Sequence, residues 1–334
     1  MAAVAEDAPA PRMLAAGQLF LDVVFSELAE APRPGEECWT TSFGWGPGGV
    51  ANYAITAARL GVPTVLCADV GSDPISALLC ARLADEGIID GTRARTDWSV
   101  PVTAAMNFDG DRALVTGGVP AAPLAALLDS APVTEVATLH LDGSVAAWVR
   151  SRAARGTRVI ADVGWDPSVS WDPALLRMLD GCYAFVPNEA EALAYTRADD
   201  ALEAAHRLSE RVPLSVVTRG VRGVVAVDSS TGDEVTTTAV DVPFVDATGA
   251  GDVFGAALAA ATLVDWTLRE RVDFASLVAA ITVSRPGGAG STPLGRELLP
   301  WLDAHVGAAE EGRFDYLRDA FSDGAPPFDT RTTS

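Results

Sequence analysis

The sequence predicts an α/β protein with a mostly parallel central sheet and a second, smaller β-sheet. Short apolar segments typical of buried strands alternate with segments of helical periodicity, and two ribbon-like segments interrupt this alternation. The chain has 334 residues, of which 49% are hydrophobic, enough to bury one large core. Strands that alternate with helices form parallel sheets with helices on both faces.

Each element of this alternation has a local reason. A first buried strand is expected over residues 13–25, and a helix over 48–61 that ends at the C-cap glycine Gly61. The further expected elements are strands at 63–71, 136–143, 157–164, 183–188 and 214–220, helices at 74–87, 144–156 and 189–196, and antiparallel edge strands at 221–228 and 233–240.

The two interrupting segments, 36–49 and 99–118, are predicted to form β-ribbons that project from the sheet as a small cover. The second ribbon contains a turn at Asp109-Gly110. Aromatic side chains on the ribbons, Phe43, Trp45 and Phe108, either cover a substrate or bury into a dimer partner, and Arg112 is a candidate lid contact. After Val306 the chain is polar and rich in Pro and Gly, with one short helix expected around 314–321.

Charge and composition exclude several classes of partner. The formal net charge is −21 and the pI about 4.4, and no run of basic residues offers a face for nucleic acid or an anionic membrane. The cysteines, at positions 38, 67, 80 and 182, form no CxxC pair, which indicates reduced thiols in a cytoplasmic protein. No signal peptide and no membrane span are expected.

The stretch DATGAGDVFGAALAAA, residues 246–261, predicts an anion site at the start of a helix. The first turn of a helix has N–H groups without internal partners, and glycines let a ligand approach them closely. The single acid there, Asp252, would repel a phosphate, so binding alone does not need it. A proton transfer from a hydroxyl that attacks the phosphate does need it. Taken alone, the stretch also fits an acid that only complements the helix dipole.

Six motifs in order show that the sequence resembles the ribokinase family, the PfkB-type carbohydrate kinases, over residues 14–305. Two positions depart mildly from the family pattern, Ala247 and Val50. The motifs are GQLFLD (17–22), GGVANYAITAARLG (48–61), NEAE (188–191), TRGVRG (218–223), DATGAGD (246–252) and AAITVSRPGGAGSTP (279–293).

The resemblance implies a ribokinase-like three-layer α/β/α fold with a small β-sheet lid. The kinase domain then spans 13–307, with lid ribbons near 23–47 and 98–118, and residues 308–334 form a C-terminal extension. It also implies ATP and Mg²⁺ as cofactors, K⁺ as a further candidate, and a homodimer formed through the lid.

The resemblance assigns roles to residues as well. Asp252 is implied as the catalytic base, and Gly249, Ala250 and Gly251 as the anion hole. The implied substrate-binding residues are Asp22, Gly48, Gly49 and Asn52. For Asn52 a helix N-cap and for Asp22 a strand-end turn are the alternative interpretations. The implied nucleotide-binding residues are Asn188, Thr218, Gly220, Gly223 and Ser276.

The metal ligands follow from the same resemblance. Glu191 is implied to bind Mg²⁺ through water, although Asn188 and Glu191 also fit a helix capping box. The implied monovalent-cation ligands are Asp246, Thr248, Thr282, Arg285, Gly287 and Ser291.

A family motif with an Asp, an Asn and an Arg is incomplete here. Asp162 matches its acid, but Gly164 replaces the Asn and the Arg is missing, so Trp165, Asp166 and Trp171 are expected to pack locally. Asp142, at the end of an expected strand, is placed at the border of the active-site crevice.

The implied function is an ATP-dependent kinase that phosphorylates a hydroxymethyl group of a small sugar or sugar acid. Two alternatives remain open at this point. One is a nucleoside kinase, since Phe43 and Trp45 could stack on a base, and the other is a catalytically silent sugar- or nucleotide-binding regulator.

Overall fold

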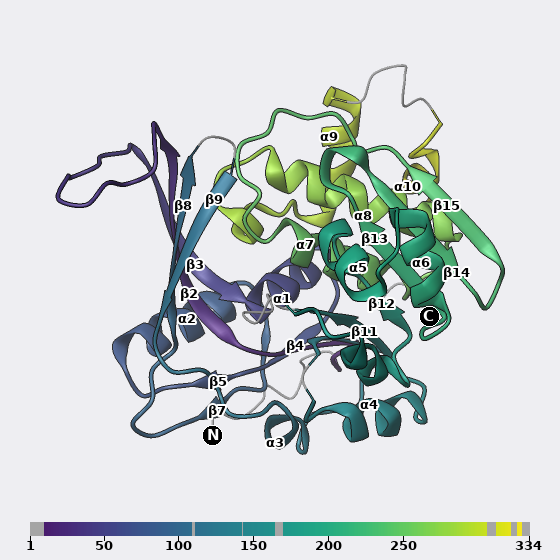
Figure 1. The fold of residues 1–334 in the computed structure, drawn as a ribbon, viewed down its shortest axis with the longest axis horizontal. Helices are drawn as coiled ribbons and strands as arrows, with labels where there is room; N and C mark the ends of the chain where they lie inside the picture. The colour runs from purple at the N-terminus through teal and green to yellow at the C-terminus, as the bar shows by residue number, and fades with distance from the viewer. Residues whose placement is uncertain are drawn as a thin grey trace.

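The computed structural model describes residues 10–108, 111–141, 143–163, 170–305, 312–321 and 326–328. A nine-stranded sheet forms the centre, in the order β15-β14-β13-β12-β11-β10-β1-β4-β6, in which β14 runs antiparallel to both of its neighbours and the other pairs are parallel (Figure 1). Its strands are β1 (Met13–Ala16), β4 (Thr64–Cys67), β6 (Ile89–Asp90), β10 (Val136–His140), β11 (Arg158–Asp162), β12 (Ala184–Phe185), β13 (Leu214–Thr218), β14 (Val224–Asp228) and β15 (Asp233–Thr237).

Helices cover both faces of this sheet, which confirms the predicted layers. Successive side chains of β1 enter opposite cores, since Met13 and Ala15 belong to one buried cluster and Leu14 and Ala16 to the other. The first cluster includes residues of α1 (Val50–Arg59), α2 (Pro74–Asp85), α7 (Ala250–Ala261), α8 (Leu268–Val283), α9 (Leu298–His305) and α10 (Asp315–Ala320). The second includes residues of α3 (Ala125–Leu128), α4 (Ala146–Ala153), α5 (Glu189–Thr196) and α6 (Ala201–Ser209).

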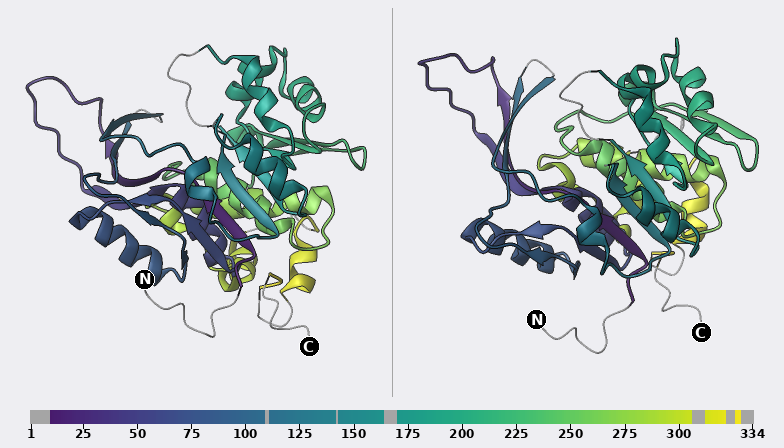
Figure 2. Two further views of the ribbon diagram at one scale, coloured as in Figure 1. Left: turned by 90° about the horizontal axis from the view of Figure 1, so that it is seen from below. Right: turned by 60° about the horizontal axis from the view of Figure 1, so that its bottom comes forward.

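The smaller sheet has four strands in the order β3-β2-β8-β9 and stands beside the main body as a lid (Figures 1 and 2). They are β2 (Leu19–Leu28), β3 (Ser42–Gly49), β8 (Val102–Phe108) and β9 (Asp111–Gly117). A separate two-stranded sheet joins β5 (Asp69–Val70) to β7 (Arg93–Ala94).

The expected single strand at 13–25 is wrong. The chain leaves the central sheet after Ala16, and β2 begins at Leu19 in the lid sheet. Gly17 still donates its N–H to the carbonyl of Cys67 on β4, but Leu21 donates to Pro101, beside β8. The apolar pattern is continuous across this point, so only the pairing partners reveal the break. The ribbon segment expected at 36–49 is also shorter than predicted, because the strand within it begins only at Ser42.

The described residues of the C-terminal segment, 312–321 and 326–328, pack on the main body. Phe314 and Phe321 are buried in the core, and the Tyr316 hydroxyl donates to the carbonyl of Glu270 at 2.7 Å. The Trp266 ring meets the Phe328 ring edge-on, with centroids 6.0 Å apart. The described part of the tail therefore covers the main body, where α10 lies beside α8 (Figure 1).

Several sequence-based predictions fall outside the described residues. These are the turn at Asp109-Gly110, the side chain of Arg112, and the positions Asp142, Trp165 and Asp166. Within the described ranges, no helix is both long enough and apolar enough to cross a membrane. Trp171, which is described, meets the Tyr195 ring edge-on at 5.3 Å, as expected for local packing.

Candidate active site

Asp252 lies in the first turn of α7, close to a glycine whose backbone conformation other residues rarely adopt. Gly249, the residue before the helix, has φ of 73°, in the left-handed region that favours glycine. A Cβ at this position would also lie 2.9 Å from Nδ2 of Asn52. Both reasons explain why the chain carries no side chain there.

The N–H groups at this helix start are partly used by the chain. Ala250 donates its N–H to the carbonyl of Ala247 at 3.1 Å. Among the described residues, the N–H groups of Gly249 and Gly251 find no acceptor, and a Cβ on Gly251 would meet open space. The two glycines therefore present the open donors of the predicted anion hole.

Asn52 holds the carboxylate of Asp252 in place. Its Nδ2 donates to Oδ2 of Asp252 at 2.8 Å, although 200 residues separate the two positions. Asn52 is only 6% exposed. The N-cap of α1 is Gly49, so the helix-cap interpretation of Asn52 is wrong.

Asp22 and the glycine pair lie where the lid joins the body. Asp22 is inside β2 and pairs with Gly46 across the sheet, so it is no strand-end turn residue. A Cβ on Gly48 would lie 1.9 Å from Oδ2 of Asp22, so only glycine fits beside this carboxylate. Gly49 has φ of 62° and leads directly into α1. The structure thus brings Asp22, the glycines and Asn52 to one place.

A cavity of about 670 Å³ opens on the other side of Asp252. The predicted anion-hole and nucleotide residues share this one cavity, although they come from separate stretches of the chain. Those lining it are Asn188, Glu191, Thr218, Gly220, Gly223, Gly249, Ala250, Gly251, Asp252 and Ser276. Ser276 is buried, and its hydroxyl donates to the carbonyl of Val272 within α8.

Asn188 and Glu191 form the capping box of α5. The Asn188 side chain accepts from the N–H of Glu191 at 3.0 Å, and Oε2 of Glu191 accepts from the N–H of Asn188 at 2.9 Å. Burial, with a smaller contribution from nearby Asp162, raises the pKa of Glu191 to about 7. The carboxylate still lines the cavity, so capping and metal binding through water are compatible.

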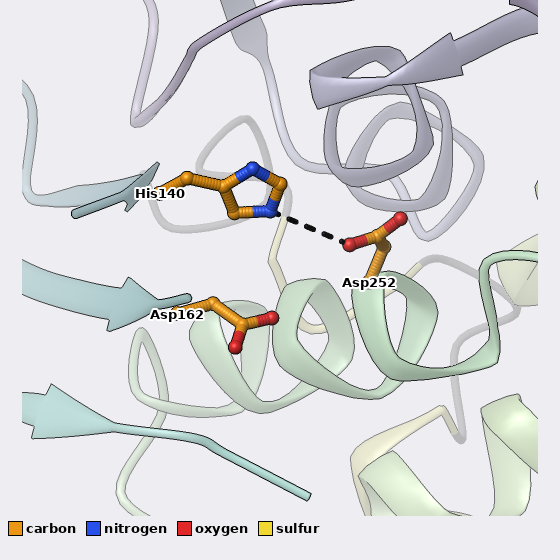
Figure 3. Close-up of side chains that lie close together, drawn as sticks. All are labelled: His140, Asp162 and Asp252. Atoms are coloured by element: carbon orange, nitrogen blue, oxygen red, sulfur yellow. Dashed lines mark ion pairs between the residues drawn. The ribbon is translucent and has the colours of Figure 1, made fainter. Parts of the chain in front are cut away.

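A histidine and a second aspartate also line the cavity beside Asp252. His140 was not predicted as a site residue, and Asp162 was noted only as the acid of an incomplete family motif. His140 and Asp162 are register partners at the ends of β10 and β11. Nε2 of His140 lies 3.7 Å from Oδ1 of Asp252 (Figure 3). The hydroxyl of Tyr53 on α1 donates to Oδ2 of Asp162 at 2.8 Å. The position of His140 at the end of a parallel strand was the available signal, since ligands lie outside such ends.

These groups shift one another's ionisation. Burial, together with the charge of neighbouring Asp252 and against the opposite effect of His140, raises the pKa of Asp162 to about 6. Burial acts to lower the pKa of His140, but the carboxylates of Asp252, Asp162 and Glu191 outweigh it and raise that pKa. Ligand atoms of His140, Asp162 and Asp252 lie within 4.8 Å of one another, close enough for a metal ion. Both carboxylates of this group already accept a hydrogen bond, Asp162 from Tyr53 and Asp252 from Asn52.

The predicted monovalent-cation residues meet behind the predicted anion hole. The buried carboxylate of Asp246 accepts from the N–H groups of Thr248, Gly287 and Gly288. Ser291 donates its hydroxyl to the carbonyls of Gly288 and Thr282. The Thr248 hydroxyl is buried with no hydrogen-bond partner among the described residues. The Arg285 guanidinium lies 3.5 Å from the carbonyl of Ser291 and 3.5 Å from the Glu297 carboxylate.

A second cavity, of about 330 Å³, lies between the lid and the loop at 286–290. Asp22 and Asn52 line it together with the exposed lid aromatics Phe43 and Trp45. Those two residues are 59% and 46% exposed. Asn52 therefore borders this cavity while it contacts Asp252, which borders the first one.

The chain matches the sequence model of the pfkB family of carbohydrate kinases over residues 21–294. It belongs to this family. The ribokinase of Haemophilus influenzae is 26% identical over 291 residues, which cover 81% of this chain and 92% of that protein. A solved ribokinase from Thermotoga maritima superposes with a TM-score of 0.72 at 24% identity, covering 87% of this chain and 99% of that one. Arabidopsis thaliana ribokinase complexed with ribose and ATP has a TM-score of 0.72 at 22% identity, covering 88% and 99%.

The PfkB family and the ribokinase fold predicted from the motifs are thus confirmed. As a PfkB-family member, the chain is a carbohydrate kinase, an enzyme that transfers phosphate to an alcohol group. In this PfkB kinase, Asp252 borders the cavity with the open backbone donors, and it accepts a hydrogen bond from Asn52, which borders the second cavity beside the lid.

Proposed function

We propose that this PfkB-family kinase transfers the γ-phosphate of ATP to a hydroxymethyl group of a small sugar or sugar acid. The observation that carries the proposal is the position of Asp252. It borders the 670 Å³ cavity, and it is held by Asn52, which borders the lid cavity. A hydroxyl bound on the lid side and a phosphate bound on the cavity side would meet at this carboxylate.

In the proposed reaction, Asp252 accepts the proton of the acceptor hydroxyl as its oxygen attacks the γ-phosphorus, and the bond from that phosphorus to the bridging oxygen breaks so that ADP leaves. The N–H groups of Gly249 and Gly251 receive the charge that spreads over the transferred phosphoryl oxygens. Asp22 and Asn52 orient the acceptor, because carboxylate and amide groups offer complementary hydrogen bonds to hydroxyls. Positioning and electrostatic stabilisation are the main requirements of phosphoryl transfer.

We place the nucleotide in the larger cavity, against the loop of Thr218, Gly220 and Gly223 and beside Ser276. The Arabidopsis ribokinase, which shares this fold, is complexed with ribose and ATP in its solved structure, and this supports the choice of ATP. Glu191 is the proposed Mg²⁺ residue, through water, since its carboxylate lines the same cavity. Mg²⁺ held there would supply positive charge that neutralises the phosphates.

We also propose K⁺ as a monovalent cation behind the anion hole. The support is the meeting of Asp246, Thr248 and Ser291, together with the buried hydroxyl of Thr248, which has no hydrogen-bond partner among the described residues. Arg285 already neutralises part of this region, so the expected contribution of K⁺ is to shape the loop.

A nucleoside acceptor is the second candidate, and one observation favours it. Phe43 and Trp45 expose their rings in the lid cavity, where a base could stack. A silent binding protein on the same fold has less support, because Asp252 and its orienting residue Asn52 are both in place.

The test is a panel of sugars, sugar acids and nucleosides assayed for ADP release with MgATP. Turnover with a sugar or sugar acid well above that with any nucleoside is the expected result. A preference for nucleosides would assign the aromatics to base recognition. ADP release with no member of the panel, from protein that binds MgADP, would leave the silent binding protein as the better description.

A further inference from the structure

One wall of the larger cavity is a segment without regular secondary structure, residues 239–244, which follows β15. The residues of this wall segment that line the cavity are Ala239, Val240, Asp241, Val242 and Phe244. Among the described residues, the wall segment makes no backbone–backbone hydrogen bond. Its far end is held to α8, because Val245 and Asp246 donate their N–H groups to the carbonyl of Val283.

The near end of the wall segment is held from the C-terminal part of the chain. Arg313 donates through Nη2 to the carbonyl of Thr238 at 2.9 Å, and through Nε to Oδ1 of Asp273 at 2.8 Å. Asp273 belongs to α8 and is only 1% exposed. The guanidinium therefore joins the start of the wall segment to the same helix that holds its other end.

The position of Arg313 is itself fixed by its neighbours. The buried Phe314 ring lies 5.1 Å from the guanidinium carbon, and the Tyr316 hydroxyl donates to the carbonyl of Glu270 on α8. This part of the chain lies beyond residues 21–294, over which the chain matches the family. A planar guanidinium presents its donors in a fixed geometry, so it can join a carboxylate to a carbonyl in one defined arrangement.

The backbone at Thr238 also adjoins the loop that the proposed function assigns to the nucleotide. A Cβ on Gly223 would lie 1.9 Å from the carbonyl oxygen of Thr237, so this loop packs directly on the chain where the wall segment begins. Gly220 and Gly223 line the same cavity as the wall segment. A displacement of the backbone at 237–238 would therefore alter two sides of the cavity together.

We propose that Arg313 is a positioning residue for the nucleotide, because it holds the wall segment against α8 and so sets the shape of the larger cavity. This inference rests on the proposed function, which places ATP in that cavity. A preformed pocket spares the ligand the free energy of ordering the protein around it. The acceptor is proposed to bind beside Asp22 and Asn52, which line the other cavity. Loss of the Arg313 contact should therefore weaken nucleotide binding and leave the KM of the acceptor nearly unchanged.

The experiment measures the Kd of MgADP by calorimetry and the KM of the acceptor in the wild type and in Arg313→Lys. The lysine keeps a charge beside Asp273 but lacks the planar fork, and we expect the Kd to rise about 3- to 10-fold, the scale of one hydrogen bond. Arg318→Lys is the matched control and should match the wild type. Arg318 lies on α10 in the same part of the chain and forms an exposed ion pair with Asp303.

A second variant removes the buried charge together with its partner. Replacing Arg313 alone by an apolar residue would leave the Asp273 carboxylate buried and unpaired, which is strongly destabilising. The double variant Arg313→Met/Asp273→Leu avoids this cost, yet it also lacks the bond to Thr238. We expect the same rise in the Kd of MgADP from this variant as from Arg313→Lys.

Hydrogen exchange distinguishes positioning from a general loss of stability. In both Arg313 variants the N–H groups of the wall segment should exchange faster, whereas those of β13 should exchange as in the wild type. A wild-type Kd in the folded variants would overturn the inference, and so would equal losses of nucleotide and acceptor binding. A wild type that binds neither MgADP nor MgATP would reject the proposed nucleotide site itself, so the two failures are distinguishable.

Discussion

Replacing Asp252 by asparagine should separate chemistry from binding. The variant keeps the shape of the side chain, and its amide oxygen can accept the same bond from Nδ2 of Asn52 that Oδ2 accepts at 2.8 Å. The loss of one acid in the first turn of α7 should cost about 0.3–1 kcal/mol of folding free energy through the helix dipole. The loss of the proton acceptor should lower turnover by about 10²–10⁴, the usual contribution of a positioned base. At 1.36 kcal/mol for each factor of ten, this corresponds to about 3–5 kcal/mol in the barrier.

The assay is steady-state ADP release with the preferred acceptor, together with calorimetric binding of MgADP. Binding should be nearly unchanged, because the open N–H groups of Gly249 and Gly251 remain. Asp315→Asn is the matched control, since Asp315 also stands in the first turn of a helix, on the exposed surface of α10. Normal turnover in the Asp252 variant would remove this residue from the mechanism. Equal losses of turnover and of MgADP binding would assign it a structural role instead.

Three further predictions concern the metals and the assembly. Glu191→Gln should raise the Mg²⁺ concentration for half-maximal rate, and in the wild type that concentration should increase as the pH falls below about 7, because the Glu191 carboxylate then gains a proton. If the variant and the wild type show the same Mg²⁺ dependence, the role of Glu191 is only to cap α5. Replacing K⁺ by a large organic cation at constant ionic strength should lower the rate, and an unaffected rate would argue against a functional cation near Asp246. We propose a homodimer through the lid sheet, because Phe43 and Trp45 expose apolar surface there, and light scattering at micromolar concentration should give twice the mass of one chain. A monomeric mass would contradict it.

Local sequence was sufficient for much of the fold. The helix expected at 189–196 matches α5 residue for residue, because its capping box and periodicity are both local. The antiparallel pairing of β14 and β15 was likewise predicted, but of the two expected edge strands only β15 lies at the edge, because β14 pairs with β13 as well. The glycine pattern 249–251 indicated an anion site by itself, because the conformational freedom of glycine is a property of the residue.

Pairing between distant segments was beyond the reach of local patterns. Residues 13–25 are apolar almost throughout, so nothing in their periodicity shows that β1 pairs with β4 and β10 while β2 pairs with β3 and β8. The tail is polar in composition, yet Phe314, Phe321 and Phe328 are buried against α8 and its neighbours. Composition alone does not show whether an aromatic residue in a polar segment is buried, because that depends on the distant segment against which it packs.

The sequence by itself determined the family, the alternation of strands and helices in much of the chain, and the identity of the acid at the start of α7. Each of these follows from residues that are neighbours along the chain. Only the tertiary structure decided what surrounds that acid. Three stretches of the chain, separated by about a hundred residues each, contribute Asn52, His140 and Asp252. These residues meet because β10 ends at the side of the sheet where α1 and α7 begin. The charge that each group carries depends on that meeting, because burial and neighbouring carboxylates set the pKa of a side chain.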